Sequence, residues 1–284
     1  YEAVHDGSLK DENGNVLGGE YVTDVLIGDY GFNYLQKLCN ELAKRCELNN
    51  KCGIHVHIGN GLEGNLFSKK HIVNLYLLCY YIQEDLSKMM PASRRNNEYC
   101  RYINHVSGLN LYKNSSKGSK ESMKIFYEDA YEKLVQYFAY DKGYDPKLHN
   151  KKSQHPLGNK CGYNHSTPRY CWVNFIPAVF NTRGNGALTV EFRNHSASLN
   201  YVKIKKWILI CMAIVDFAEN YSDSITPTIT INDILMKVYP KRGNLLVKYI
   251  EERKQKFISK LSEKDEYKKE QDIKNMNLKD VILA

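Results

Sequence analysis

The chain has 284 residues, enough for one large α+β domain or two small ones with a sizeable hydrophobic core. Its 43% hydrophobic and 25% charged residues are ordinary for a soluble globular protein, and its longest apolar run, residues 207–215, is too short to span a bilayer. The net charge of +8 suits acidic or phosphorylated partners, but basic charge alone is weak evidence for nucleic acid. We therefore expect neither a membrane nor a nucleic acid as partner.

Eight cysteines are scattered along the chain without a C-x-x-C pair. Several of them, such as Cys79 and Cys211, lie among apolar neighbours. This pattern is typical of reduced thiols that serve as small core residues, so it predicts a cytoplasmic protein.

The first 50 residues predict turns, a strand and a helix. Residues 5–19 are rich in Gly, Asp and Asn, which favours turns, and residues 20–27 are a strand candidate. Over residues 30–46 the apolar side chains recur at a spacing of three to four, which indicates an amphipathic helix; they are Leu35, Leu38, Leu42 and Cys46.

Residues 52–59, CGIHVHIG, alternate between aliphatic and histidine side chains. In a strand this pattern puts His55 and His57 on one face and the aliphatic residues on the other. Ser68 then predicts the N-cap of a long buried helix that reaches Met90, where a proline follows.

The middle of the chain predicts a loop at 113–122, a helix at 123–140 and a long loop at 141–168, the last without any periodicity. Strands are expected at 171–176 and 187–195. In the second strand three apolar residues alternate with polar residues that share the other face, namely Thr189, Glu191, Arg193 and His195.

An apolar helix follows this strand. We expect Ser198 to cap it and expect the helix to run to about residue 220. Residues 250–284 are dense in charge, which indicates a peripheral or partner-binding extension that is helical at most.

Three constellations can carry chemistry. His55 and His57, two residues apart on a strand, suit metal ligation or a polyanion, although a pair of surface histidines has the same spacing. Glu191 and Arg193 offer an oxygen ligand for Mg²⁺ beside a guanidinium that binds phosphate or carboxylate, although an in-strand ion pair is the simpler reading. The arginines that follow the helix expected from Ser68 to Met90 suit a triphosphate. Alternatively, they only complement the dipole at the end of that helix.

Taken together and in order, these pieces resemble the amidoligase family, relatives of glutamine synthetase and glutamate–cysteine ligase. The resemblance covers roughly residues 5–220 with one divergent insert. The matching segments are DGS at 6–8 with Gly19-Glu20, KCGIHVHIG at 51–59, PASRRNNEYCRY at 91–102, RYCWVNF at 169–175 and ALTVEFRNHSASLNYVKIKKWILICMAIVDFA at 187–218.

The resemblance implies an α+β fold with a curved antiparallel sheet of the glutamine synthetase catalytic-domain type, helices on one face and an active-site cleft on the other. It implies a catalytic domain at 1–222, with 141–168 as a long loop insert. Residues 223–284 would be a charged, mainly helical extension that offers a surface to a protein partner.

The implied activity is an ATP-dependent carboxylate–amine ligase that forms an amide through an acyl phosphate, with Mg²⁺ or Mn²⁺. Its partners would be a carboxylate and an amine donor, which is an amino acid, a peptide or a protein. The implied catalytic residues are Glu191, Arg193 and Arg101. The implied nucleotide contacts are His55, His57, Arg94 and Arg169. The implied metal ligands are Glu20, His57 and Glu191.

Two departures from the family pattern bear on this expectation. Relatives open with a strand carrying a G-x-E-x-E pair of metal carboxylates, which this sequence lacks. Because the first residue is Tyr1, we expect either that the segment starts inside a longer polypeptide or that its metal site is depleted. Relatives also often have Gly-Thr where this chain has Ala197-Ser198.

Three alternatives remain open at this stage. The first is a catalytically impaired amidoligase-like domain that acts as a binding or structural component of a larger assembly. The second is a zinc hydrolase that uses the H-x-H pair. The third concerns a separate zinc site in the long loop around Cys161 and His165, where irregular spacing favours ordinary loop residues.

Overall fold

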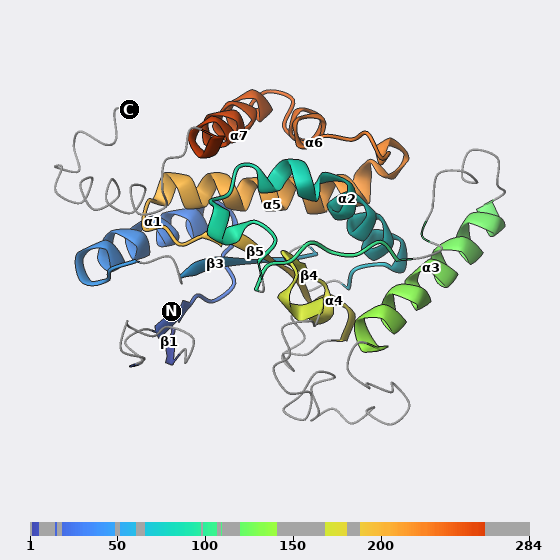
Figure 1. The fold of residues 1–284 in the computed structure, drawn as a ribbon, viewed down its shortest axis with the longest axis horizontal. Helices are drawn as coiled ribbons and strands as arrows, with labels where there is room; N and C mark the ends of the chain where they lie inside the picture. The colour runs from blue at the N-terminus through green and yellow to red at the C-terminus, as the bar shows by residue number, and fades with distance from the viewer. Residues whose placement is uncertain are drawn as a thin grey trace.

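The computed structural model describes residues 2–5, 15, 19–48, 52–60, 66–97, 99–106, 109, 120–140, 168–180 and 188–258 (Figure 1). Within these ranges the chain forms seven α-helices and two small antiparallel sheets. The expected mixture of helix and sheet is therefore confirmed. The insert at 141–167 and the tail at 259–284 lie outside the described residues.

The central sheet has three strands in the order β3 (Gly53–Gly59), β5 (Thr189–Ser196) and β4 (Val173–Asn174). Both pairings are antiparallel, and they place His57 and Asn174 opposite Glu191 from its two sides. The strand expected at 171–176 is thus only two residues long, because a short helix, α4 (Ile176–Phe180), begins directly after it.

A bulge in the pairing of β3 with β5 changes which side chains share a face. Residues 54–56 of β3 pair with residues 192–195 of β5, so β5 carries one extra residue. His195 consequently turns toward the core, fully buried, with its ring 5.2 Å from that of Trp207. The prediction that His195 shares a face with Glu191 was wrong, because strict alternation does not survive a bulge.

Two long helices cover the core side of this sheet (Figure 1). They are α2 (Lys69–Ser87) and α5 (Tyr201–Asn220), whose apolar residues form the main core with the inner side chains of β5. The Ser68 side chain accepts from the His71 amide and caps α2 as expected. The cap of α5 is Asn200 rather than Ser198, since the Asn200 side chain accepts from the amide of Lys203.

The amino-terminal residues form a separate two-stranded sheet. It pairs β1 (Glu2–His5) with β2 (Gly19–Val22), so the strand expected over 20–27 ends early. Helix α1 (Gly28–Arg45) follows and buries Leu35 and Cys39 against Ile204 of α5.

The remaining helices enlarge the same core. Helix α3 (Lys120–Tyr140) packs its Phe138 ring against the Phe175 ring at 5.7 Å. Helices α6 (Ile231–Val238) and α7 (Gly243–Ile258) lie on the side of α5 that faces away from the sheet (Figure 1) and bury Ile234 and Ile250 completely.

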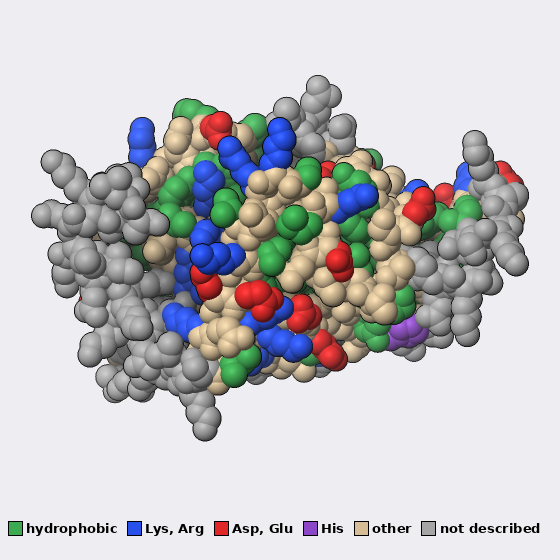
Figure 2. All heavy atoms as spheres, turned by 90° about the horizontal axis from the view of Figure 1, so that it is seen from above, with side chains coloured by type: hydrophobic (Ala, Val, Ile, Leu, Met, Phe, Trp, Pro, Cys, Tyr) green, Lys and Arg blue, Asp and Glu red, His purple; other side chains and the backbone are tan. Residues whose placement is uncertain are grey.

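The outer face of these last helices carries both basic and acidic side chains (Figure 2). Among the described helices none is both long enough and apolar enough to cross a bilayer.

Candidate functional site

A buried carboxylate joins the two strands that the sequence singled out. His55 Nδ1 lies 3.2 Å and His57 Nε2 lies 3.7 Å from Oε1 of Glu191. Because β3 and β5 are antiparallel neighbours with His57 opposite Glu191, both imidazoles reach the same oxygen. The His57 ring is oriented from its other side by Thr189, whose Oγ1 lies 3.0 Å from Nδ1.

Two further side chains complete what we call the Glu191 cluster, which consists of His55, His57, Asn174, Glu191 and Arg193. Arg193 Nη1 donates to Oε1 of Glu191 at 2.6 Å, and Asn174 Nδ2 donates to Oε2 at 2.7 Å. Glu191 is 6% exposed, so these contacts are made largely without water.

Asn174 was not predicted from the sequence. It is held by its own hydrogen bond, in which Oδ1 accepts from the amide of Ile176 at 3.0 Å. The signal that could have found it is its place in the segment WVNF, one of the pieces of the family resemblance. Asn174 fixes the second oxygen of Glu191, so it orients the carboxylate.

The electrostatics of the cluster keep Glu191 ionised. Burial alone raises the pKa of a carboxyl group, but here the hydrogen bond from His55, the charge of Arg193 and the two imidazoles outweigh it. The pKa of Glu191 therefore lies well below its usual range. At neutral pH the site holds a negative charge that a cation or a hydrogen-bond donor can use.

Two of the expected arginines meet on one aromatic ring. The guanidinium of Arg193 lies 5.7 Å and that of Arg169 lies 5.9 Å from the centroid of Tyr170. Arg193 Nε also points to the carbonyl oxygen of Tyr99, 3.4 Å away. Two guanidinium groups therefore lie near the Tyr170 ring at the margin of the Glu191 cluster.

Arg94 borders the same face of β3. It ends the short helix η1 (Ala92–Arg94), is buried, and donates to the carbonyl oxygen of Cys52. A Cβ at Gly53 would lie 2.9 Å from its Nη1, so any larger residue there would make the guanidinium shift from this position. Gly53 and His55 are two residues apart on β3 and share a face, which brings Arg94 to the side of the histidines.

Arg101 lies farther from the carboxylate. Its backbone extends the central sheet beyond β4, with its amide donating to Tyr170 and its carbonyl accepting from Trp172. Two strand spacings, about 10 Å, separate its backbone from β5, and Glu191 lies a further three residues along, because Arg101 pairs with Cys171 whereas Asn174 is opposite Glu191.

Glu20 does not lie on the central sheet. It is exposed on β2, in the separate two-stranded sheet. Among the described residues, no three or more His, Cys, Asp or Glu side chains are grouped as a metal-ion site. A magnesium ion prefers oxygen ligands, and the cluster supplies one ionised carboxylate beside one guanidinium and two imidazoles. These groups suit a phosphate-bearing ligand that brings its own metal ion better than they suit a metal ion held by protein groups alone.

The alternative of a loop zinc site involves Cys161 and His165, which lie outside the described residues. The nearby Cys171 is buried, and its thiol lies 3.9 Å from the carbonyl oxygen of Tyr102. The backbone of Cys171 forms an isolated bridge with that of Arg101.

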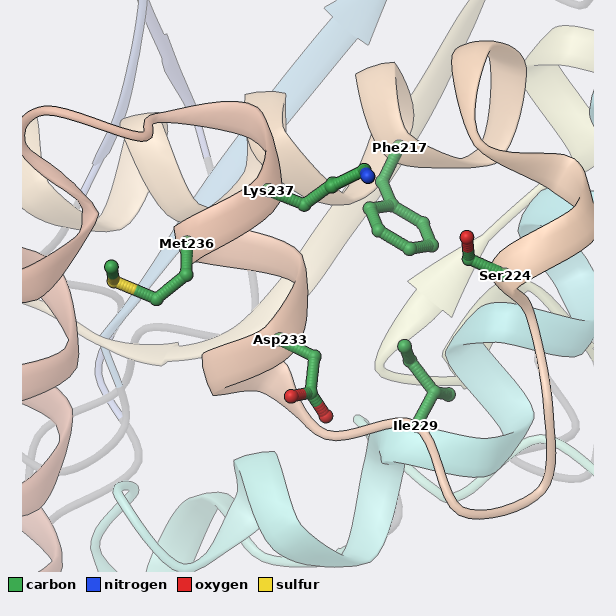
Figure 3. Close-up of a pocket in the computed structure, with 6 residues that line it drawn as sticks. All are labelled: Phe217, Ser224, Ile229, Asp233, Met236 and Lys237. Carbon is green, nitrogen blue, oxygen red and sulfur yellow. The ribbon is translucent and has the colours of Figure 1, made fainter.

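A separate hollow of about 380 Å³ lies at the end of α5 (Figure 3). Its lining contains none of the Glu191 cluster; it consists of Phe217, Ser224, Ile229, Asp233, Met236 and Lys237. The Asp233 carboxylate already accepts from Thr230, in the capping box of α6. We therefore take the Glu191 cluster, rather than this hollow, as the candidate functional site.

The comparisons with known proteins give one match. The model of a family described as "Putative amidoligase enzyme" matches residues 3–215, well over half of the chain. No curated protein and no solved structure matches the chain. The matched range contains all the residues of the Glu191 cluster and ends within α5.

Proposed function

Because the chain belongs to the amidoligase enzyme family, we propose that it is an ATP-dependent carboxylate–amine ligase that works through an acyl phosphate. The family membership supports an amide-forming ligase. The nucleotide, the magnesium and a central sheet of the glutamine synthetase type belong to the proposal.

The observation that carries this proposal is the convergence of two imidazoles, a carboxylate and a guanidinium from neighbouring strands. His55 and Arg193 both lie within 3.2 Å of one oxygen of Glu191. Charges of both signs held in a largely water-free site stabilise a transferring phosphoryl group better than the same groups in water.

When bound, magnesium ATP supplies the phosphoryl group that turns the substrate carboxylate into an acyl phosphate, which an amine attacks as phosphate leaves. In this proposal Glu191 holds the cation, and the imidazoles of His55 and His57 orient the phosphates. Arg193 gives up its ion pair with Glu191 and binds phosphate or the substrate carboxylate through its guanidinium.

Arg94 and Arg169 add positive charge at the margins of the same sheet. Arg101 and Glu20 keep their proposed roles toward substrate and metal only if bound ligands bring them closer to the Glu191 cluster. The substrates would be a carboxylate and an amine donor. A cytoplasmic location is part of the proposal, on the pattern of scattered cysteines without a C-x-x-C pair.

A second function is favoured by a specific observation. Both oxygens of Glu191 already have protein partners, which suits an impaired domain that binds another molecule without catalysis. The two proposals differ in whether magnesium can replace Arg193 at the carboxylate.

The decisive experiment measures ADP formation by the purified full chain with ATP and Mg²⁺, using a panel of carboxylates and amines. We expect turnover that needs both substrates and is lost in Glu191→Gln. Glu41→Gln is the matched control, because Glu41 is half-exposed on α1 and forms its ion pairs with Lys44 and Arg45 of the same helix. A folded wild-type chain that neither binds nor hydrolyses magnesium ATP would exclude the ligase and leave the binding domain.

A further inference from the structure

Helix α7 is anchored to the end of α2 although it lies beyond the range that matches the family. Arg253 Nε donates to the carbonyl oxygen of Met89 at 3.0 Å, and Lys254 Nζ forms an ion pair with Asp85 at 3.0 Å. Arg253 is 5% exposed, so its hydrogen bond to the Met89 carbonyl is buried. Buried charged hydrogen bonds hold elements together more firmly than exposed ones.

A second arginine reinforces the same turn from within. Arg95 donates to the carbonyl oxygen of Met90 at 2.7 Å and to that of Lys88 at 3.0 Å. The guanidinium carbons of Arg95 and Arg253 lie 5.9 Å and 5.1 Å from the ring centroid of Phe257 on α7. The three carbonyls of residues 88–90 are therefore all bonded by guanidinium groups that α7 supplies or contacts.

This turn continues directly into the segment that carries Arg94. Pro91 is buried and follows Met90, and η1 then brings the Arg94 guanidinium over Gly53 on β3. One end of the segment is thus fixed by α7, and the other end lies beside the histidine face of the central sheet. A shift at the α7 end would move Arg94 relative to His55.

We propose that Arg253 is a positioning residue: by holding the turn at residues 88–90, it fixes the position of Arg94 in the candidate site. Helix α7 therefore contributes to the geometry of that site. The inference rests on the proposed function for what Arg94 binds. Sites that hold phosphate need their charged groups placed to within about 0.5 Å, and misplacement by about 1 Å can cost 100-fold. The cation of Arg253 itself touches neither nucleotide nor substrate in this proposal.

The test compares Arg253→Met with Lys248→Met, a control on α7 whose side chain is 77% exposed. We expect Arg253→Met to weaken magnesium ATP binding about 10-fold by calorimetry, with a smaller change in kcat. Arg253→Lys, which keeps a cationic donor, should recover part of that affinity. Lys248→Met should behave as the wild type.

A double variant separates positioning from loss of stability. If Arg253 acts through Arg94, then Arg253→Met should have little further effect on nucleotide affinity in an Arg94→Met background. Fully additive losses would overturn the inference.

Hydrogen exchange of residues 88–97 gives a readout that needs no activity. Exchange should be faster in Arg253→Met than in Lys248→Met. Unchanged exchange overturns the inference even if the chain is an active ligase. If the wild-type chain does not bind ATP, the proposed function is refuted instead, whatever the exchange shows.

Discussion

Replacing Glu191 by glutamine tests the buried charge balance of the cluster. Glutamine keeps the size of the side chain but removes the charge that Arg193 contacts at 2.6 Å, where both side chains are at most 10% exposed. Removing one partner of a buried ion pair costs about 3–5 kcal/mol, because the other charge is left uncompensated. Arg193 keeps its contacts with the Tyr99 carbonyl and the Tyr170 ring, so we expect the unfolding free energy to fall by about 3 kcal/mol at neutral pH.

The difference in unfolding free energy between wild type and Glu191→Gln should become smaller in acid, which makes the prediction specific to the charge of Glu191. The pKa of Glu191 is lowered in the folded state, so its carboxylate stabilises the fold above the unfolded value of 4.5. That stabilisation is lost as the pH falls through the folded pKa. Glutamine does not titrate, so the unfolding free energies of wild type and variant should converge below pH 4.5.

Urea unfolding at neutral pH and at a series of lower values measures both effects. Glu41→Gln should leave the unfolding free energy close to the wild-type value, because its ion pairs are exposed on one helix. Equal midpoints for wild type and Glu191→Gln at neutral pH, or a difference that stays constant into acid, would refute the reasoning.

Two further predictions concern the site and the packing of the helices. Gly53→Ala should displace the Arg94 guanidinium and weaken magnesium ATP binding about 10-fold by calorimetry, whereas Gly59→Ala, whose nearest new contact is at 3.7 Å, should not. Burial lowers the pKa of His71, so stability should fall as the pH drops below the unfolded value of 6.5, where the unfolded chain takes up the proton first. His71→Gln should flatten that pH dependence in urea unfolding, and an unchanged slope would contradict the assignment.

Local patterns in the sequence were enough to predict which side chains share a face in each half of the candidate site. Alternation along residues 52–59 separated the histidines from the aliphatic face, and the same period paired Glu191 with Arg193. Both pairs lie on strands in the structure, with the histidines on the side of the carboxylate. A period of two is set by backbone geometry within one strand, which is why sequence alone reveals it.

Only the tertiary structure decided how those halves meet. His57 lies opposite Glu191 because of strand register, which depends on contacts between segments far apart in the chain. The bulge that turns His195 into the core and the packing of α7 on the end of α2 have the same origin. A single strand or helix fixes the direction of its own side chains, whereas the partner that each side chain meets is fixed by burial across the whole core.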